Sequence, residues 1–116
     1  MVYFMVNYRA ERLNRVFAAL VDPTRRDMLS RLEKASLSVS QLAEPLTIKL
    51  PAVMKHLDVL SDAGLIKRRK TGRVVTVTLA PAPMAEAMAW LQRYEKYWNL
   101  SLDRLTHFLE KKKPTS

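Results

Sequence analysis

Seven basic side chains lie between Thr47 and Leu79, against only two acidic ones, Asp58 and Asp62. This segment therefore carries +5 of the chain's formal net charge of +9. Such a concentration of lysine and arginine favours an anionic partner, a nucleic acid first and an anionic membrane surface second. A solvated surface without a partner is the plainer interpretation. The basic residues are Lys49, Lys55, Lys67, Arg68, Arg69, Lys70 and Arg73.

The local pattern in this segment predicts a helix followed by a hairpin. Pro51 suits the first turn of a helix, and Gly64 is typical of the residue just past a helix end. Residues 65–70 and 73–79 then read as two strands around a Thr71-Gly72 turn. A helix fits the major groove of B-DNA, and a hairpin beside it can reach the backbone or the minor groove.

The residues before this segment predict three further helices. Apolar steps of three and four indicate a helix over 9–21, and Asp22-Pro23 restarts the chain as a second helix ending near Lys34. Ser38 and Gln41 fit a capping box that opens a very short third helix, over 38–46. The order of four helices, two strands and a last helix predicts a mainly α fold with a small β-hairpin, a winged helix-turn-helix.

The last helix is predicted to run from about residue 84 to residue 109, after Pro81 and Pro83 break the second strand. At 1.5 Å per residue it spans roughly 39 Å, more than so small a chain needs. Its length, with Trp90 and Trp98, favours a dimer interface over a small-molecule pocket or plain core. The predicted interface, on helices 9–21 and 84–109, consists of Leu13, Val16, Phe17, Leu91, Tyr94, Trp98, Leu102 and Leu105.

The composition narrows the class of protein. A chain of 116 residues, 48% hydrophobic and 27% charged, is expected to form one globular domain, residues 1–116. The absence of cysteine excludes disulfides, thiolate ligands and thiol catalysis. With two histidines and two glycines the chain has no phosphate-binding loop and no catalytic motif, so no enzyme is expected. No signal peptide or membrane span is apparent, which predicts a cytoplasmic protein that does not bind membranes.

In a helix-turn-helix, the first helix braces the second, whose N-terminal half meets the base edges. Here residues 38–46, the brace helix, would support residues 51–63, which we call the reading helix. Ala52 can pack on a thymine methyl and His56 can donate to a phosphate. Several of these residues have a structural alternative: Lys55 as a solvated charge, His56 as a cap or core-edge residue, and Arg69 and Arg73 of the predicted hairpin, the wing, as cross-strand surface charges. The predicted DNA-binding residues are Lys49, Pro51, Ala52, Lys55, His56, Arg68, Arg69, Lys70 and Arg73.

Several segments together match a specific pattern, namely residues 17–26, 39–43, 51–57, 63–66, Gly72-Arg73, 90–98 and 101–105. They resemble the ArsR family of winged-helix repressors over nearly the whole chain. The resemblance implies a homodimer built on the first and last helices, which binds an operator and blocks transcription. Such a dimer would place two reading helices about 34 Å apart and would require a pseudo-palindromic operator on double-stranded DNA.

The chain departs from the family's metal sensors, and this implies a branch without metal sites. Ser38 and Ser40 stand where the sensors carry cysteines, and serine hydroxyls are poor ligands for soft metals. The family's second site uses carboxylates and histidines on the last helix, where His107 is this chain's only histidine. No metal and no cofactor are therefore expected, and the sequence names no small-molecule effector.

Two residues differ from what is usual in this branch, where serine stands in place of Lys49 and Met54. Loss of the serine ahead of Pro51 removes an N-cap, and Lys49 opposes the helix dipole unless it meets a phosphate. The operator is therefore expected to differ from those of relatives, or to be bound more weakly. Two further functions stay open, a winged-helix module that binds protein or RNA and a non-specific architectural DNA-binding protein.

Overall fold

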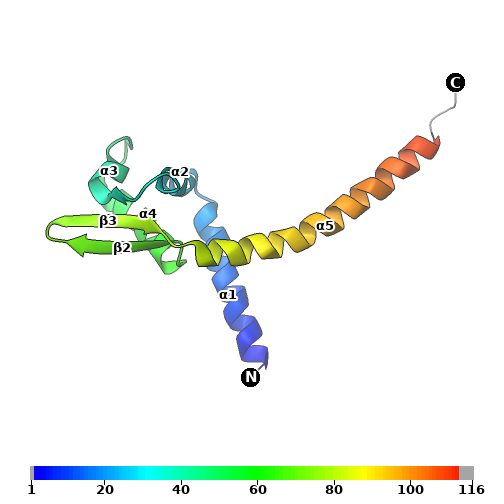
Figure 1. The fold of residues 1–116 in the computed structure, drawn as a ribbon, viewed down its shortest axis with the longest axis horizontal. Coiled ribbons are helices and arrows are strands. Elements are labelled where there is room, and N and C mark those ends of the chain that lie inside the picture. Colours follow the sequence, from blue (N-terminus) through cyan, green and yellow to red (C-terminus); the bar gives the residue numbers. More distant parts are fainter. Residues whose placement is uncertain (1, 113–116) are drawn as a thin grey trace.

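The structure, a computed structural model, describes the backbone of residues 2–112 and the side chains of residues 8–111. Five helices and three strands follow one another along the chain (Figure 1). They are α1 (Val2–Leu20), α2 (Pro23–Leu32), β1 (Leu37–Ser38), α3 (Val39–Ala43), α4 (Leu50–Asp62), β2 (Ile66–Thr71), β3 (Val74–Leu79) and α5 (Pro81–Lys112). The predicted order of four helices, a hairpin and a long last helix is confirmed.

One strand was not predicted, and it turns the hairpin into a three-stranded sheet. The strand order is β1-β3-β2, all antiparallel, with Leu37 opposite Val77 and Ser38 opposite Thr76. Because β1 has only two residues, it leaves no alternating pattern that a sequence reading can detect. Ser38 also serves as the N-cap of α3, so the sheet leads directly into the helix-turn-helix.

The outer helices are longer than predicted. The first begins at Val2, although the apolar spacing that predicted it begins only at Leu13. The last begins at Pro81, and both Pro81 and Pro83 lie in its first turn, where no intrahelical hydrogen bond is lost for want of their N–H groups. The prediction that these prolines precede the helix was therefore wrong. The predicted ends of the inner helices and strands differ by a few residues.

The hydrophobic core lies beneath α4 and draws on every helix. Val53, Leu57 and Leu60 of α4 are fully buried, as the apolar spacing predicts. They pack with Met28 of α2 and Val77 of β3, among others. Truncation of such a leucine to alanine typically costs about 2–5 kcal/mol of stability. The core therefore holds the inner side of α4 and leaves its outer side to solvent.

Gly64 ends α4 and brings its C-terminus against the start of α5. Its φ is 74°, and the N–H of Leu65 donates to the Leu60 carbonyl at 3.0 Å, which is the predicted glycine-terminated helix end. A Cβ at this position would lie 3.1 Å from Cγ of Pro83. A larger residue at position 64 would therefore be strained both by its φ and by the approach of α5.

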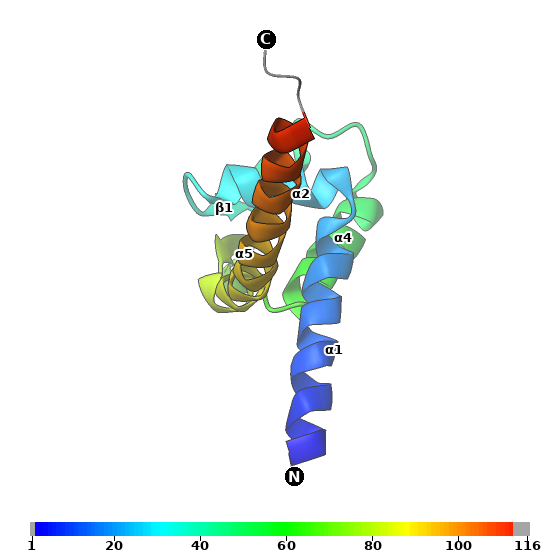
Figure 2. The same cartoon turned by 90° about the vertical axis from the view of Figure 1, so that its right-hand side faces the viewer.

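Beyond its first turns α5 leaves the body of the molecule. Of the side chains of α5 that the structure describes, only Ala87 belongs to the buried core. Figure 1 shows the helix projecting away from the sheet and the other helices, and Figure 2 shows the molecule from the side where α5 ends. Trp90 packs against α1, with its ring centroid 5.5 Å from that of Phe17, and the ring centroid of Tyr94, also on α5, lies 4.5 Å from that of Trp90. No helix within residues 2–112 is long and apolar enough to cross a membrane.

Candidate nucleic-acid interface

The brace helix α3 is fixed at both ends by polar contacts. Its capping box forms as predicted, because Gln41 N donates to Ser38 Oγ at 3.1 Å and Ser38 N donates to Gln41 Oε1 at 2.9 Å. At the other end, Arg31 of α2 donates to the carbonyls of Leu42 (2.9 Å) and Gln41 (2.7 Å). A cation at a helix C-terminus satisfies free carbonyls and complements the dipole. Sequence reasoning missed this role of Arg31.

The N-terminal half of α4 is open to solvent. Lys49 is its N-cap residue and makes no side-chain capping hydrogen bond, as its departure from serine predicts. Pro51 and Lys55 are exposed, while Ala52 and Met54 are half-buried. Lys49 and Lys55 form no ion pair with any of the described residues. This half of α4 therefore offers two unneutralised ammonium groups and small contact surfaces, which suits a phosphate backbone.

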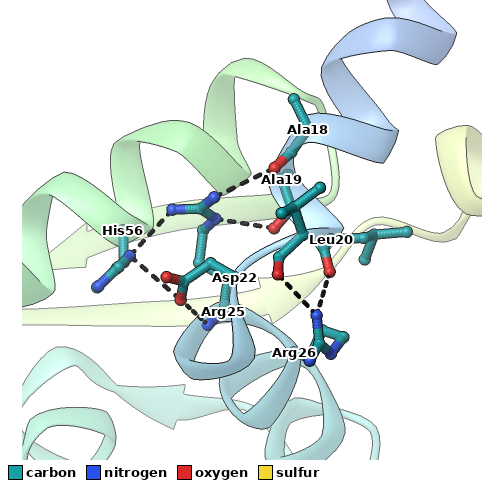
Figure 3. A network of polar contacts seen from close by, with 8 residues as sticks. Ala18, Ala19, Leu20, Asp22, Arg25, Arg26 and His56 are labelled. Atoms are coloured by element: carbon teal, nitrogen blue, oxygen red, sulfur yellow. Dashed lines mark hydrogen bonds and ion pairs between the residues drawn. The ribbon is translucent and has the colours of Figure 1, made fainter.

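His56 lies on the inner edge of α4 and contacts the start of α2. Its Nδ1 is 3.1 Å from Nη1 of Arg25 and 3.8 Å from Oδ2 of Asp22, and its side chain is 20% exposed. Figure 3 shows its other ring nitrogen directed away from these two residues. Since the Arg25 guanidinium can only donate, Nδ1 accepts from it and the ring proton lies on Nε2. Nδ1 of His56 thus has the structural role that the core-edge alternative assigned to this residue, and only Nε2 remains available to donate to a phosphate.

Arg25 connects α4 to the end of α1. Its Nε donates to the Ala19 carbonyl at 2.8 Å and its Nη2 to the Ala18 carbonyl at 3.2 Å (Figure 3). Arg26 supports the same turn, since its Nη1 donates to Leu20 and Val21 carbonyls at 2.7 and 2.9 Å. We call Asp22, Arg25 and His56 the helix junction. Asp22-Pro23 was predicted only as a helix start, and nothing in the spacing indicated that Arg25 reaches α4.

Asp22 caps α2 as predicted, with its carboxylate accepting from Arg25 N at 3.0 Å. This backbone hydrogen bond is the main cause that lowers the pKa of the Asp22 carboxyl, and the charge of the Arg25 guanidinium adds to it. Partial burial opposes the shift. Asp22 is therefore held in its charged form at the helix junction.

The basic residues of the wing do not share one face. In the β2–β3 register Arg68 is opposite the buried Val77, whereas Lys67 and Arg69 are opposite Thr78 and Thr76. Since side chains alternate along a strand, Arg68 lies on the side that faces the core and Arg69 on the other. Arg68 Nη1 donates to Asp58 Oδ1 of α4 at 2.8 Å.

The Arg68–Asp58 ion pair joins β2 to α4 at the edge of the core that the two elements share. Arg68, which was predicted to bind DNA, therefore already has an ion-pair partner within its own chain. Lys70 and Arg73, close to the tip, remain exposed with Arg69, and none of the three has an ion-pair partner within residues 8–111.

The predicted dimer interface divides into exposed and buried residues. On α5 the side chains of Leu91, Tyr94, Trp98, Leu102 and Leu105 are each about half exposed. On α1, Leu13 and Phe17 are partly buried against the core, and Val16 is 1% exposed. Placing Val16 on the interface was wrong, because its side chain is enclosed within its own chain. Among the described residues no group of three or more His, Cys, Asp or Glu is arranged to hold a metal ion.

Comparisons with known proteins agree with this architecture. A helix-turn-helix domain family matches residues 20–69, from the helix junction to the wing. The transcriptional repressor SdpR of Bacillus subtilis is 28% identical over 82 residues, which are 71% of this chain and 91% of that protein. The HTH-type transcriptional regulator Rv2034 of Mycobacterium tuberculosis is 37% identical over 90 residues, 78% of this chain and 82% of that one.

Among solved structures, an ArsR family transcriptional regulator, RHA00566, superposes with a TM-score of 0.74 at 42% identity. The match covers 78% of this chain and 93% of that one. This identity and coverage are those of a family member. This chain belongs to the ArsR family of winged helix-turn-helix, DNA-binding transcriptional regulators.

Proposed function

We propose that this protein is a homodimeric repressor that binds a pseudo-palindromic operator through the N-terminal half of α4 and the wing. The observation that carries this proposal is the exposed basic surface on α4 and on the neighbouring wing, which meet at the Arg68–Asp58 ion pair. Both elements expose basic side chains that have no carboxylate partner within residues 8–111, namely Lys49, Lys55, Arg69, Lys70 and Arg73. Repression follows when the bound protein excludes other proteins from the operator, as the name of the relative SdpR suggests.

The dimer is proposed to form through α1 and α5. Leu91, Trp98 and Leu105 recur every seven residues on α5, and all are about half exposed. A contiguous apolar surface of this kind on a single chain marks an interaction site. Packing against a second copy would bury it and place the two reading helices about one DNA turn apart, 34 Å. Because a repressor acts where the DNA it binds is transcribed, we place the protein in the cytoplasm, and we propose no metal or cofactor.

Selection of bound sequences from a random duplex pool tests this function. We expect an enriched sequence with two inverted half-sites spaced by about one helical turn. The enriched duplex should bind at least about a thousandfold tighter than unrelated duplexes. Equal binding of all duplexes within about threefold would leave a non-specific architectural role. Absence of salt-sensitive duplex binding would instead favour a protein- or RNA-binding module.

Substitutions of single lysine and arginine residues test which side chains bind the DNA. Lys55→Gln and Arg73→Gln should each weaken binding to the enriched duplex and reduce the slope of log affinity against log salt by about one. Lys96→Gln, on the exposed α5, is the matched control and should leave both quantities unchanged. Equal effects of all three substitutions would mean that only total charge matters.

A further inference from the structure

An apolar cavity of about 330 Å³ lies where α2, the β2–β3 hairpin and the start of α5 meet. Leu29 and Leu65 are buried and form its floor. Met84, Ala85 and Met88 of α5 form one wall, and Glu33, just past the end of α2, is its only charged lining residue. This volume lies in the range of small-molecule sites in proteins. None of the predicted DNA-binding residues lines it.

The position of the cavity on α5 separates it from the proposed dimer interface. At about 100° per residue, Met88 lies about 80° and Ala85 about 140° around the helix from the centre of the stripe of Leu91, Trp98 and Leu105, with Met84 at the border, about 40° away. Along the same face the next residues are Gln92, Glu95 and Asn99, which are polar and exposed. A second copy packed along the apolar stripe therefore meets polar residues on this side. The cavity is suited to a small molecule rather than to the partner helix.

The lining determines the chemistry of the ligand. Unbranched methionine side chains adapt to the shape of an apolar body. Glu33 forms no ion pair with any described residue, so its carboxylate is available to a ligand. A second anion next to it would be repelled, and the lining offers no base to compensate. We propose that this cavity binds a small organic cation, an apolar body carrying one amine whose ammonium group pairs with Glu33.

The location of the cavity gives binding a consequence for DNA recognition, and this step rests on the proposed function. Its walls join α2, which belongs to the winged domain, to α5, which carries the proposed dimer interface. Next to the cavity, Gly64 at the end of α4 lies so close to Pro83 of α5 that an added Cβ would be 3.1 Å from Pro83 Cγ, so a shift of α5 here is transmitted to α4. A ligand between the two elements changes the angle of α5 and hence the separation of the two reading helices. The amine is thus an effector that binds one arrangement better than the other.

Calorimetry without DNA tests the site itself, with three probes that share one apolar body: phenylbutylamine, phenylbutanol and phenylbutyrate. We expect the amine to bind about three to five times tighter than the alcohol, as for a partly exposed ion pair. The butyrate should bind more weakly than the alcohol. Glu33→Gln should remove the preference for the amine and leave the affinity for the alcohol unchanged. Glu44→Gln, an exposed glutamate after α3, should retain the preference.

Filling the cavity provides the second test. Ala85→Trp should abolish binding of all three probes, whereas Ala35→Trp, exposed beyond the end of α2, should not. Thermal unfolding shows that each variant is folded, and the methyl resonances of Met84 and Met88 should shift when the amine is added to the unaltered protein. Failure of all probes to bind overturns the proposal, as does an amine preference that survives Glu33→Gln. If Ala85→Trp dissociates the dimer, a second copy occupies the cavity and the proposal is wrong.

The regulatory step has its own measurement. With the selected duplex, saturating phenylbutylamine should change DNA affinity by at least about fivefold, the lower end of typical allosteric coupling. Glu33→Gln should lose this response at the same amine concentration. Binding to the cavity without a change in DNA affinity overturns the effector role. Because calorimetry uses no DNA, failure of the proposed operator binding leaves the ligand result standing and is recognised separately.

Discussion

Asp22, Arg25 and His56 join the end of α1, the start of α2 and the middle of α4 through their side chains. Arg25 fills the free carbonyls at the end of α1 while it donates to the ring of His56 on α4. Asp22 caps α2 and lies 3.8 Å from the same ring. The orientation of the reading helix relative to α1 therefore depends on a few charged atoms. A change at any one of them should affect both stability and DNA binding.

Asp22→Asn should destabilise the protein most at neutral pH. The folded pKa of Asp22 lies below its ordinary value of 3.8, so its charge contributes stability above that value. This contribution is lost as the pH falls through the lowered folded pKa, because the carboxyl is then protonated in both states. Asparagine can still cap α2, so only the charge contribution is lost, and the difference in unfolding free energy measured in urea should be below about 1 kcal/mol at neutral pH and shrink towards zero in acid. Asp27→Asn, exposed on the same helix, serves as control.

Asp58→Asn should strengthen binding to duplex DNA. The pair with Arg68 is partly exposed, so its loss should change stability by less than about 1 kcal/mol. Arg68 would then be free to neutralise a phosphate, and the salt slope should rise by about one. Asp62→Asn removes the same charge from the same helix without freeing an arginine. An equal rise in slope for both variants would show that Arg68 does not reach the DNA.

At the scale of the elements, helix starts differ in how they are capped. Asp22 and Ser38 cap α2 and α3 with side-chain hydrogen bonds, but Lys49 leaves α4 without one. A cation at this end also opposes the helix dipole. The element that meets DNA in our proposal is thus less stabilised at its start than the helices that brace it. Such a departure from local rules is typical of a functional site.

Lys49→Ser should raise stability and weaken DNA binding at the same time. A serine N-cap typically adds about 0.5–1 kcal/mol to the free energy of unfolding. Loss of the ammonium group should reduce the salt slope by about one if Lys49 meets a phosphate. Chemical denaturation and fluorescence anisotropy measure the two effects. Lys34→Ser, exposed after α2, should change neither; a stabilised variant with an unchanged slope would remove Lys49 from the DNA surface.

The elements that were predictable are those with local causes. The capping box, the glycine end of α4 and the alternating strand β3 each depend on residues close in the chain. The contacts of Arg25 with His56 and of Arg68 with Asp58 join residues 31 and 10 positions apart, and no spacing rule indicates them. Burial of Val16 was misassigned for the same reason, since one apolar stripe on α1 serves both the core and the surface. Tertiary packing decides between the two.

At the scale of the whole molecule, the single chain is elongated, with extents of 72 × 46 × 21 Å, because α5 projects from the body (Figure 1). The outer half of α5 exposes a row of large apolar side chains to water, and a surface of this kind favours association with another protein surface. The core already accounts for α1 through α4 and the sheet without the outer half of α5. Dimer formation and folding of the winged domain should therefore be separable.

The variant Trp98→Glu with Leu105→Glu should separate them by breaking the dimer while the winged domain stays folded. Both side chains are more than half exposed and contribute nothing to the core, so circular dichroism should still report a cooperative unfolding transition. Light scattering should find a dimer for the unaltered protein at micromolar concentration and a monomer for the variant, because buried unpaired carboxylates are costly in an interface. Asn99→Glu, on the polar face, should remain dimeric. The monomer retains one reading helix, so it should bind a half-site as the dimer's subunit does but lose the gain that comes from linking two half-sites, commonly at least a hundredfold. A variant that stays dimeric would place the interface elsewhere on the chain.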